Sequence, residues 1–129
     1  MSAKAKGSRR EREVRDLLRE QGYEVTRAGG SLGMFDLVAT PVSEDCLKDA
    51  CGNYLVRYIQ VKSNRWPPVA ERRRMEEAGI RGPHSREIWR CNDYRGWQVL
   101  ALMGDGWHEV NGTMVRQKAL VRIRQRERN

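Results

Sequence analysis

Two polar side chains, Gln60 and Lys62, belong to a segment that otherwise has the composition of an inner β-strand. Residues 54 to 61 are rich in β-branched and aromatic side chains. Because side chains alternate across a strand, Gln60 and Lys62 share one face and Val61 lies on the other. An amide and an ammonium on one face could act together on a ligand. The plainer alternative is the exposed polar face of an edge strand.

Two carboxylates could complete such a site. Asp36 stands at the head of an apolar strand, directly after a loop with three glycines, which lets backbone or substrate approach closely. On a helical wheel Glu11 lies only about 20° from Leu18, at the border of the apolar face, whereas the other acids of that helix lie on the solvent side. Two alternatives stay open: Glu11 could be the capping-box partner of Ser8, and Asp36 could be a turn acceptor.

These residue types together fit metal-dependent hydrolysis of a phosphodiester. That reaction needs a hard cation held by oxygens, with open positions for the substrate, to polarise the phosphoryl group and to lower the pKa of an attacking water. Glu11, Asp36 and the side-chain oxygen of Gln60 would supply such oxygens, and the carbonyl of Val61 is a further candidate. Lys62 could orient or deprotonate the water, or offset charge on the phosphorane. We therefore expect a site for a hard divalent cation.

A helix and two neighbouring strands must hold these groups. Ser8 and Glu11 predict a helix over residues 9–21 that Gly22 ends. Composition and turn residues predict a second helix and six strands. The second helix is expected at 69–79, and the strands at 23–27, 35–40, 54–62, 86–91, 96–103 and 106–110. The order α-β-β-β-α-β-β-β predicts an α/β domain with a mixed sheet.

The length predicts one domain over residues 1–129. Two basic segments flank its centre. We expect residues 1–7 to form a short basic arm and residues from about 116 to 129 to form a basic tail.

Three segments, in order, resemble the motifs of the archaeal-type Holliday junction resolvases, which belong to the PD-(D/E)xK nuclease superfamily. They are KGSRREREVRDLL from Lys6, TRAGGSLGMFD from Thr26 and IQVKS from Ile59. The resemblance covers residues 4 to about 64 and implies a restriction-endonuclease-like fold, a mixed central β-sheet flanked by helices. It also implies a magnesium-dependent endonuclease that acts as a homodimer and nicks opposed strands of a four-way DNA junction. The positions that match the family's site are Glu11, Arg27, Ser31, Asp36, Gln60 and Lys62.

One departure concerns the chemistry directly, because Gln60 stands where the family usually has a carboxylate. An amide oxygen can coordinate Mg²⁺, but the site loses one formal negative charge, so we expect weaker metal binding. The glycine loop before Asp36 is also one residue longer than in the family's pattern, and the polar segment at 41–53 is longer than a hairpin needs. These two differences bear on the choice of substrate more than on the class of reaction.

The charge of the chain favours a polyanionic partner. It carries 25 Lys and Arg against 17 Asp and Glu, a net charge of +8, without the Trp- and Leu-rich amphipathic stripe of a membrane-surface helix. Contacts of Lys and Arg with phosphates bind DNA without reading its sequence, which suits recognition of a branched shape. A solvated surface is the alternative for each residue taken singly. The residues expected to contact DNA are Lys6, Arg10, Arg12, Arg15, Arg19, Arg27, Arg72, Arg73 and Arg74.

Three cysteines in a chain without an export signal argue against disulfides. A zinc site built from Cys46 and Cys51 with His84 or Cys91 is a weaker alternative, because the gap between the first two is not a standard finger spacing. We expect buried or loop thiols. No apolar run is long enough for a membrane span or a signal core, so we expect a cytoplasmic protein, in the host cytoplasm if it is encoded by a virus.

Two other functions remain open from the sequence. One is a restriction- or repair-type endonuclease that cuts other DNA structures. The other is a non-catalytic DNA-binding module in which Gln60 marks a decayed site. Comparing cleavage of a four-way junction with cleavage of a linear duplex separates the first of these from a resolvase. Asp36→Asn tests the second, because a nuclease should lose cleavage and keep binding, whereas a pure binder has no activity to lose.

Overall fold

A six-stranded mixed sheet with one helix on each face forms the described part of the chain. The computed structural model describes residues 3–28, 34–93 and 95–110, with side chains from residue 7 onward. Its elements are α1 (Ala3–Glu20), β1 (Tyr23–Arg27), β2 (Leu37–Pro41), β3 (Val56–Ser63), α2 (Val69–Glu77), β4 (His84–Asn92), β5 (Gly96–Met103) and β6 (Gly106–Val110). This is the order of elements predicted from the sequence.

The strands follow one another across the sheet in chain order, from β1 to β6. The pair β3 and β4 is parallel, and the other neighbouring strands are antiparallel. Two parallel neighbours need a crossover connection, and α2 lies in that connection. The predicted fold class is therefore confirmed: the structure is α/β, with a mixed central sheet flanked by helices as in restriction endonucleases.

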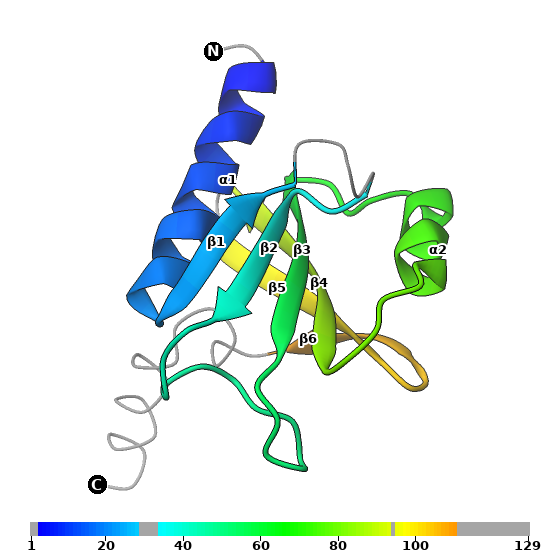
Figure 1. The fold of residues 1–129 in the computed structure, drawn as a ribbon. Coiled ribbons are helices and arrows are strands. Elements are labelled where there is room, and N and C mark those ends of the chain that lie inside the picture. The colour runs from blue at the N-terminus through cyan, green and yellow to red at the C-terminus, as the bar shows by residue number, and fades with distance from the viewer. Residues whose placement is uncertain (1–2, 29–33, 94, 111–129) are drawn as a thin grey trace, which may run out of the picture.

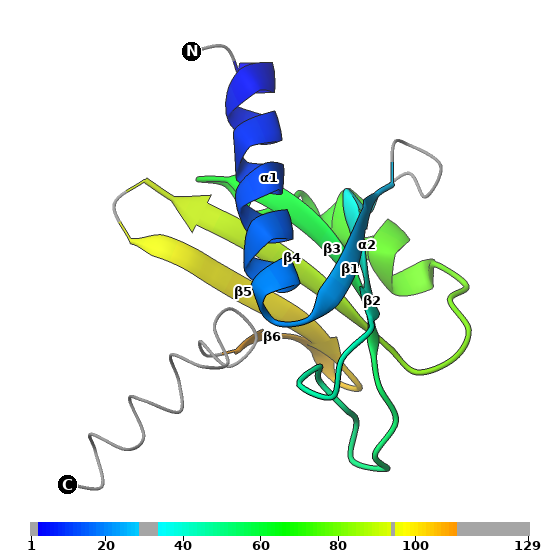
Figure 2. The ribbon, with the colours of Figure 1, turned by 60° about the vertical axis from the view of Figure 1, so that its left-hand side comes forward.

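The two helices cover opposite faces of the sheet, as Figures 1 and 2 show together. Under α1, Val14 and Leu18 pack against Ile59 and Trp89 in the larger hydrophobic core. Under α2, a smaller core holds Met75. The alternation of side chains along β3 assigns its residues to these two layers, because Ile59 belongs to the α1 side whereas its neighbours Tyr58 and Gln60 must project to the α2 side.

The first helix begins earlier than the sequence pattern indicated. It starts at Ala3, so the capping box of Ser8 and Glu11 was wrong, and residues 3–7 are the first part of α1 and not a separate arm. Alanine and lysine are good helix formers, and they let the helix extend past the expected cap. Glu11 therefore has no capping role. The end of the helix was predicted correctly to within one residue.

Gly22 ends α1 in a conformation that other residues adopt rarely. Its φ is 99°, its N–H donates to the carbonyl of Arg19, and a Cβ at this position would lie 1.9 Å from Oγ of Ser43. We predict that Gly22→Ala lowers the free energy of unfolding by about 2 kcal/mol or more, because it adds a steric clash to a strained backbone. Urea denaturation measures this change.

A matched glycine provides the control for Gly22→Ala. Gly104 has no positive φ, and a Cβ there would meet no atom of the described residues within 4 Å. Gly104→Ala should leave the urea midpoint nearly unchanged. Equal midpoints for the two variants would contradict the clash with Ser43.

Below α1, the sheet buries an ion pair that the sequence pattern did not reveal. Arg57 of β3 and Glu87 of β4 are both fully buried, and two nitrogens of Arg57 donate to the two carboxylate oxygens of Glu87, each at 2.8 Å. Trp89 Nε1 donates to Glu87 at 2.9 Å. The arrangement links the two parallel strands β3 and β4.

The cysteines and the termini complete the comparison with the sequence. Cys46 and Cys91 are buried and Cys51 is exposed, and all three are free thiols, as expected. Among the described residues, no helix is long and apolar enough to cross a membrane. The basic tail expected at 116–129 lies outside the described residues.

Candidate functional site

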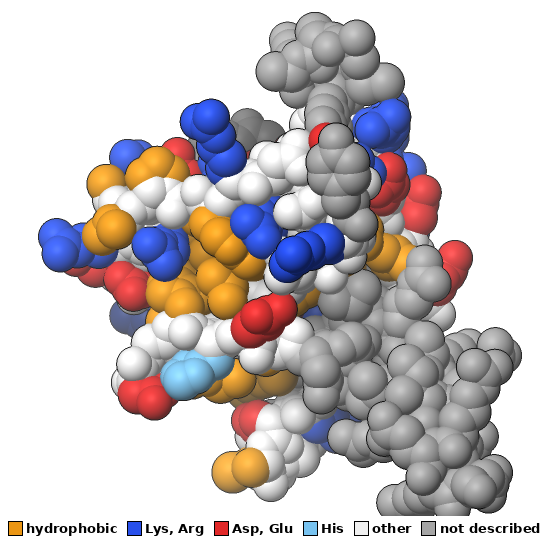
Figure 3. Space-filling view, turned by 180° about the vertical axis from the view of Figure 1, so that it is seen from behind, with side chains coloured by type: hydrophobic (Ala, Val, Ile, Leu, Met, Phe, Trp, Pro, Cys, Tyr) orange, Lys and Arg blue, Asp and Glu red, His pale blue; other side chains and the backbone are white. Residues whose placement is uncertain are grey.

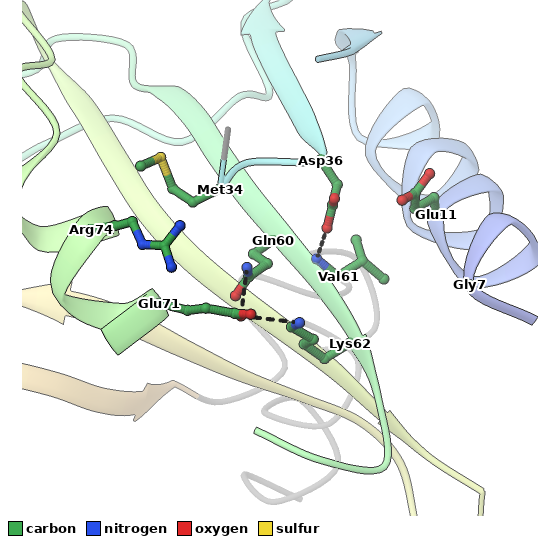
Figure 4. A pocket seen from close by; sticks show the side chains of 9 residues that line it. All are labelled: Gly7, Glu11, Met34, Asp36, Gln60, Val61, Lys62, Glu71 and Arg74. Atoms are coloured by element: carbon green, nitrogen blue, oxygen red, sulfur yellow. Dashed lines mark hydrogen bonds and ion pairs between the residues drawn. The ribbon is translucent and has the colours of Figure 1, made fainter. Parts of the chain in front are cut away.

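A cavity of about 270 Å³ opens where α1, the segment before β2, the end of β3 and α2 approach one another. Figure 4 shows its lining from close by. Three acids, two bases and one amide contribute polar groups to it. The lining residues are Gly7, Glu11, Met34, Asp36, Gln60, Val61, Lys62, Glu71 and Arg74.

Asp36 occupies the point where the pairing of β2 and β3 ends. Its N–H donates to the carbonyl of Ile59 at 2.8 Å, and its Oδ2 accepts the N–H of Val61 at 2.7 Å. The carboxylate thus acts as a backbone acceptor, the alternative that the sequence left open, and it also lines the cavity. Burial raises the pKa of Asp36, the hydrogen bond from Val61 lowers it, and the nearby charge of Glu11 raises it again, so that the pKa lies above its usual range.

Gln60 is the most deeply buried polar group of the cavity, with 6% of its surface exposed. Its Nε2 donates to Oε2 of Glu71 at 3.4 Å. Its Oε1 has no hydrogen-bond partner among the residues that the structure describes. A buried amide oxygen normally has a donor, so this atom has an unfilled acceptor position next to the cavity.

Lys62 lies one pleat further along the same face of β3. Its Nζ forms an ion pair with Glu71 Oε2 at 3.1 Å, and about a third of each side chain is exposed. The alternation that predicted a shared face for Gln60 and Lys62 therefore leads both groups to the same carboxylate. Figure 4 shows Glu71 reaching toward them from α2.

Glu71 is a cavity acid that the sequence analysis did not single out. It lies four residues before Met75, the buried residue by which α2 packs on the sheet. Residues at i and i+4 share one face of a helix, so this spacing was the available signal that Glu71 faces the sheet. This spacing was hard to recognise because α2 is highly charged and Met75 is its one buried residue.

Glu11 reaches the cavity from α1, on the opposite side of Asp36 from Glu71 in Figure 4. Its Oε2 pairs with Nη2 of Arg27 at 2.5 Å, and 21% of the Glu11 side chain is exposed. The helical wheel placed Glu11 beside the apolar stripe that packs on the sheet. The structure puts it at the end of that contact, where α1 borders the cavity.

The three acids of the cavity are not gathered into a metal site as their side chains lie. Within the described part of the chain, no three His, Cys, Asp or Glu side chains form a group that could hold an ion. Glu11 is engaged by Arg27 and Glu71 by Lys62. Each carboxylate at the two sides of the cavity is thus paired with a cation of the protein.

The basic residues expected to bind DNA have different surroundings. Arg10 is only 13% exposed and pairs with Glu13 and Asp93, which ties α1 to the turn after β4. Arg15 pairs with Asp16. Those with exposed side chains are Arg12, Arg19, Arg27, Arg73 and Arg74, and Arg72 is partly buried. The side chain of Lys6 and all of Ser31 lie outside what the structure describes.

The face of the molecule that points away from the viewer in Figure 1 carries both basic and hydrophobic side chains. Figure 3 shows Lys and Arg side chains around a group of hydrophobic side chains on this face. Beside α2, Trp66, Leu100 and Trp107 are only partly buried against the smaller core. Arg90 lies over the ring of Trp66, with its guanidinium carbon 4.3 Å from the ring centroid.

The position of α2, and hence of Glu71, is fixed at the end of the helix by Arg86. This side chain of β4 donates to the carbonyls of Met75, Glu76 and Ala78, each at 2.6 Å. A cation at a helix C-terminus satisfies carbonyls that have no partner within the helix and interacts favourably with the helix dipole.

Comparison with known proteins bears on the N-terminal part of this arrangement. No curated protein matches the chain. The part that carries Glu11 and Asp36, but not Gln60, Lys62 or Glu71, does match a family model. Residues 2–48 match the model described as archaeal Holliday junction resolvase (hjc), which confirms the resemblance to that PD-(D/E)xK nuclease family.

Proposed function

We propose that the protein is a metal-dependent, structure-selective DNA endonuclease that resolves Holliday junctions by nicking opposed strands. The observation that carries the proposal is the shared cavity, which Glu11, Asp36 and Lys62 line from a helix and two strands. The family match over residues 2–48 supports the same function independently of the cavity. The net charge of +8 supports a nucleic-acid substrate.

The groups of the cavity fit a hard divalent cation. Carboxylate and amide oxygens suit Mg²⁺ and Mn²⁺, and Oε1 of Gln60 offers an acceptor that no donor of the described residues fills. Glu11, Asp36 and Gln60 would hold the ion, with the carbonyl of Val61 as a further ligand. When bound, such an ion polarises the phosphoryl group and lowers the pKa of an attacking water.

The residues of the chain have separate tasks in this reaction. The N–H of Val61 fixes the orientation of the Asp36 carboxylate. Lys62 is the group beside these oxygens that can carry positive charge toward a phosphate, or hold the proton of the attacking water at Nζ. Arg74 also lines the cavity, which supports a role for it in binding a neighbouring phosphate of the DNA backbone.

We also propose that the active form is a homodimer. One cavity can cut one strand, and two opposed nicks across a pseudo-symmetric junction require two cavities related by a two-fold axis. The partly buried side chains Trp66, Leu100 and Trp107 beside α2 provide hydrophobic surface that a second copy could cover. Analytical ultracentrifugation of the full chain should give twice the mass of one chain, and a monomer at micromolar concentration would contradict this assembly.

The test of the function is cleavage of a labelled four-way junction and of a linear duplex with the same arms. With Mg²⁺ we expect paired nicks in the junction and much slower cutting of the duplex, and with a chelator no cutting of either. Equal rates on the two substrates would favour a restriction- or repair-type endonuclease. Binding without cleavage in Mg²⁺ and in Mn²⁺ would favour a non-catalytic DNA-binding module.

A further inference from the structure

We propose that Glu71 of α2 is a metal ligand of this site and supplies the negative charge that Gln60 cannot. The inference rests on the proposed function, since it concerns the same cation. It adds a residue from an element outside the part of the chain that matches the family model. Its basis is the position of Glu71 relative to Gln60 and Lys62.

The first observation is that two neighbouring side chains orient Glu71 toward the cavity. Nε2 of Gln60 and Nζ of Lys62 both reach Oε2 of Glu71, at 3.4 Å and 3.1 Å. Both bonds end on one oxygen, so Oε1 of Glu71 is outside this pair of bonds. Gln60 can therefore act through its amide nitrogen on Glu71 and through its amide oxygen on a ligand at the same time.

The second observation is independent of the acids. Gln60 is more than nine-tenths buried and lines the cavity, and within the described part of the chain its Oε1 accepts no hydrogen bond. The large majority of buried side-chain polar atoms have a hydrogen-bond partner, which can be a protein group or an ordered water, and an amide oxygen can also bind a cation. The atom thus indicates a ligand at this place, and the ligand must offer positive charge or a donor.

The charge of the cavity gives the third argument. Without Glu71, the carboxylates of Glu11 and Asp36 would be balanced by Lys62 and Arg74, and the lining would not attract a divalent cation. With Glu71 the lining has three acids and two bases, and Arg27, which pairs with Glu11, lies outside the lining. A third carboxylate is what a site with an amide at position 60 needs to hold Mg²⁺ by charge.

The helix that carries Glu71 is held firmly enough for such a task. Met75 is fully buried in the smaller core, and Arg86 binds three carbonyls at the end of α2. To engage an ion, the Glu71 side chain would rotate away from Lys62. That movement would also release the ammonium of Lys62 from its ion pair.

The test is a titration of the full chain with Mn²⁺, followed by electron paramagnetic resonance, without DNA. Glu71→Gln should weaken Mn²⁺ binding by about tenfold or more. Glu77→Gln, which changes an exposed acid of the same helix, should leave the affinity within about twofold of the unmodified chain. Adding Gln60→Glu to Glu71→Gln should restore most of the lost affinity, because it returns a carboxylate to the cavity.

A second variant separates a ligand from a residue that only positions Lys62. Lys62→Met should bind Mn²⁺ at least as tightly as the unmodified chain, because it removes a cation that competes for Glu71. Weakening by Lys62→Met as large as that by Glu71→Gln would overturn the inference. So would Mn²⁺ affinity that is unchanged in Glu71→Gln, or a chain that binds no Mn²⁺.

The outcomes also distinguish this inference from the proposed function. Mn²⁺ binding that depends on Glu71, in a chain that cuts no DNA, would refute the endonuclease and leave the ligand in place. Junction cleavage and Mn²⁺ affinity that both survive Glu71→Gln would refute the ligand and leave the endonuclease.

Discussion

Asp36→Asn should abolish cleavage of a four-way junction and leave binding of the junction nearly unchanged. The substitution removes one charged oxygen donor from the cavity but keeps an oxygen that can accept the N–H of Val61. A bound cation is worth several kcal/mol to such a reaction, which corresponds to a loss of about a thousandfold in rate. Single-turnover cleavage and gel-shift binding with the same labelled junction measure the two effects.

Asp45→Asn is the matched control for this prediction. Asp45 is an exposed acid in the segment between β2 and β3 and does not line the cavity. This variant should cut at the rate of the unmodified chain. An Asp36→Asn protein that still cuts within a few-fold of that rate would remove Asp36 from the catalytic site.

The same substitution should stabilise the fold in the absence of metal. Burial, the largest cause, raises the pKa of Asp36, so the folded chain holds this proton to a higher pH than the unfolded chain does. Stability therefore falls as pH rises from the ordinary pKa of an aspartate through the raised value, and the charged form costs stability at neutral pH. The amide introduced by Asp36→Asn carries no charge, so the urea midpoint at pH 7 should be no lower than that of the unmodified chain. A lower midpoint for the variant would show that the charge stabilises the fold.

Periodicity alone was enough to predict which strand residues meet. Side chains alternate along β3 without a bulge, so Gln60 and Lys62 had to share a face, and both line the cavity. The helical wheel placed Glu11 at the border of the apolar face correctly for the same reason, since α1 packs on the sheet through Val14 and Leu18. These predictions needed only the regular geometry of one element at a time.

Contacts between elements were harder to predict. Glu71 reaches the cavity because the crossover connection places α2 beside the end of β3, and no local pattern states how far a helix lies from a strand. The predicted start of α1 was wrong for a different reason. A capping pattern competes with helix propensity, and here the helix propensity of residues 3–7 outweighed the capping pattern of Ser8 and Glu11. The burial of Arg57 could not be predicted from its local sequence, because its buried charge depends on Glu87, a partner 30 residues away.

Arg57→Met should destabilise the fold more than any other single change considered for this protein. It leaves the carboxylate of Glu87 fully buried beside Ser85 and Trp89 but without its cation. Breaking a buried pair in this way costs about 3 to 5 kcal/mol, a large part of the stability of a small domain. Urea denaturation should show the loss, and Arg65→Met, at an exposed arginine, should change the midpoint little. Replacing both partners, Arg57→Met with Glu87→Leu, should recover most of the stability, because no unpaired charge remains.

The pH dependence of the same variant tests its cause. Burial alone would raise the pKa of Glu87, but the charge and hydrogen bonds of Arg57 outweigh burial and hold that pKa below its usual range. In the unmodified chain, the charged form of Glu87 therefore contributes its full stabilisation at neutral pH. This stabilisation is lost as the pH falls from the ordinary pKa of a glutamate toward the lowered pKa of Glu87. Without Arg57, burial dominates and raises the pKa, so the variant becomes more stable as Glu87 takes up a proton on acidification. The gap in unfolding free energy between the two proteins should thus narrow as the pH is lowered from 7 toward 5. A gap that stays constant or widens over that range would mean that lost packing, and not the unpaired carboxylate, destabilises the variant.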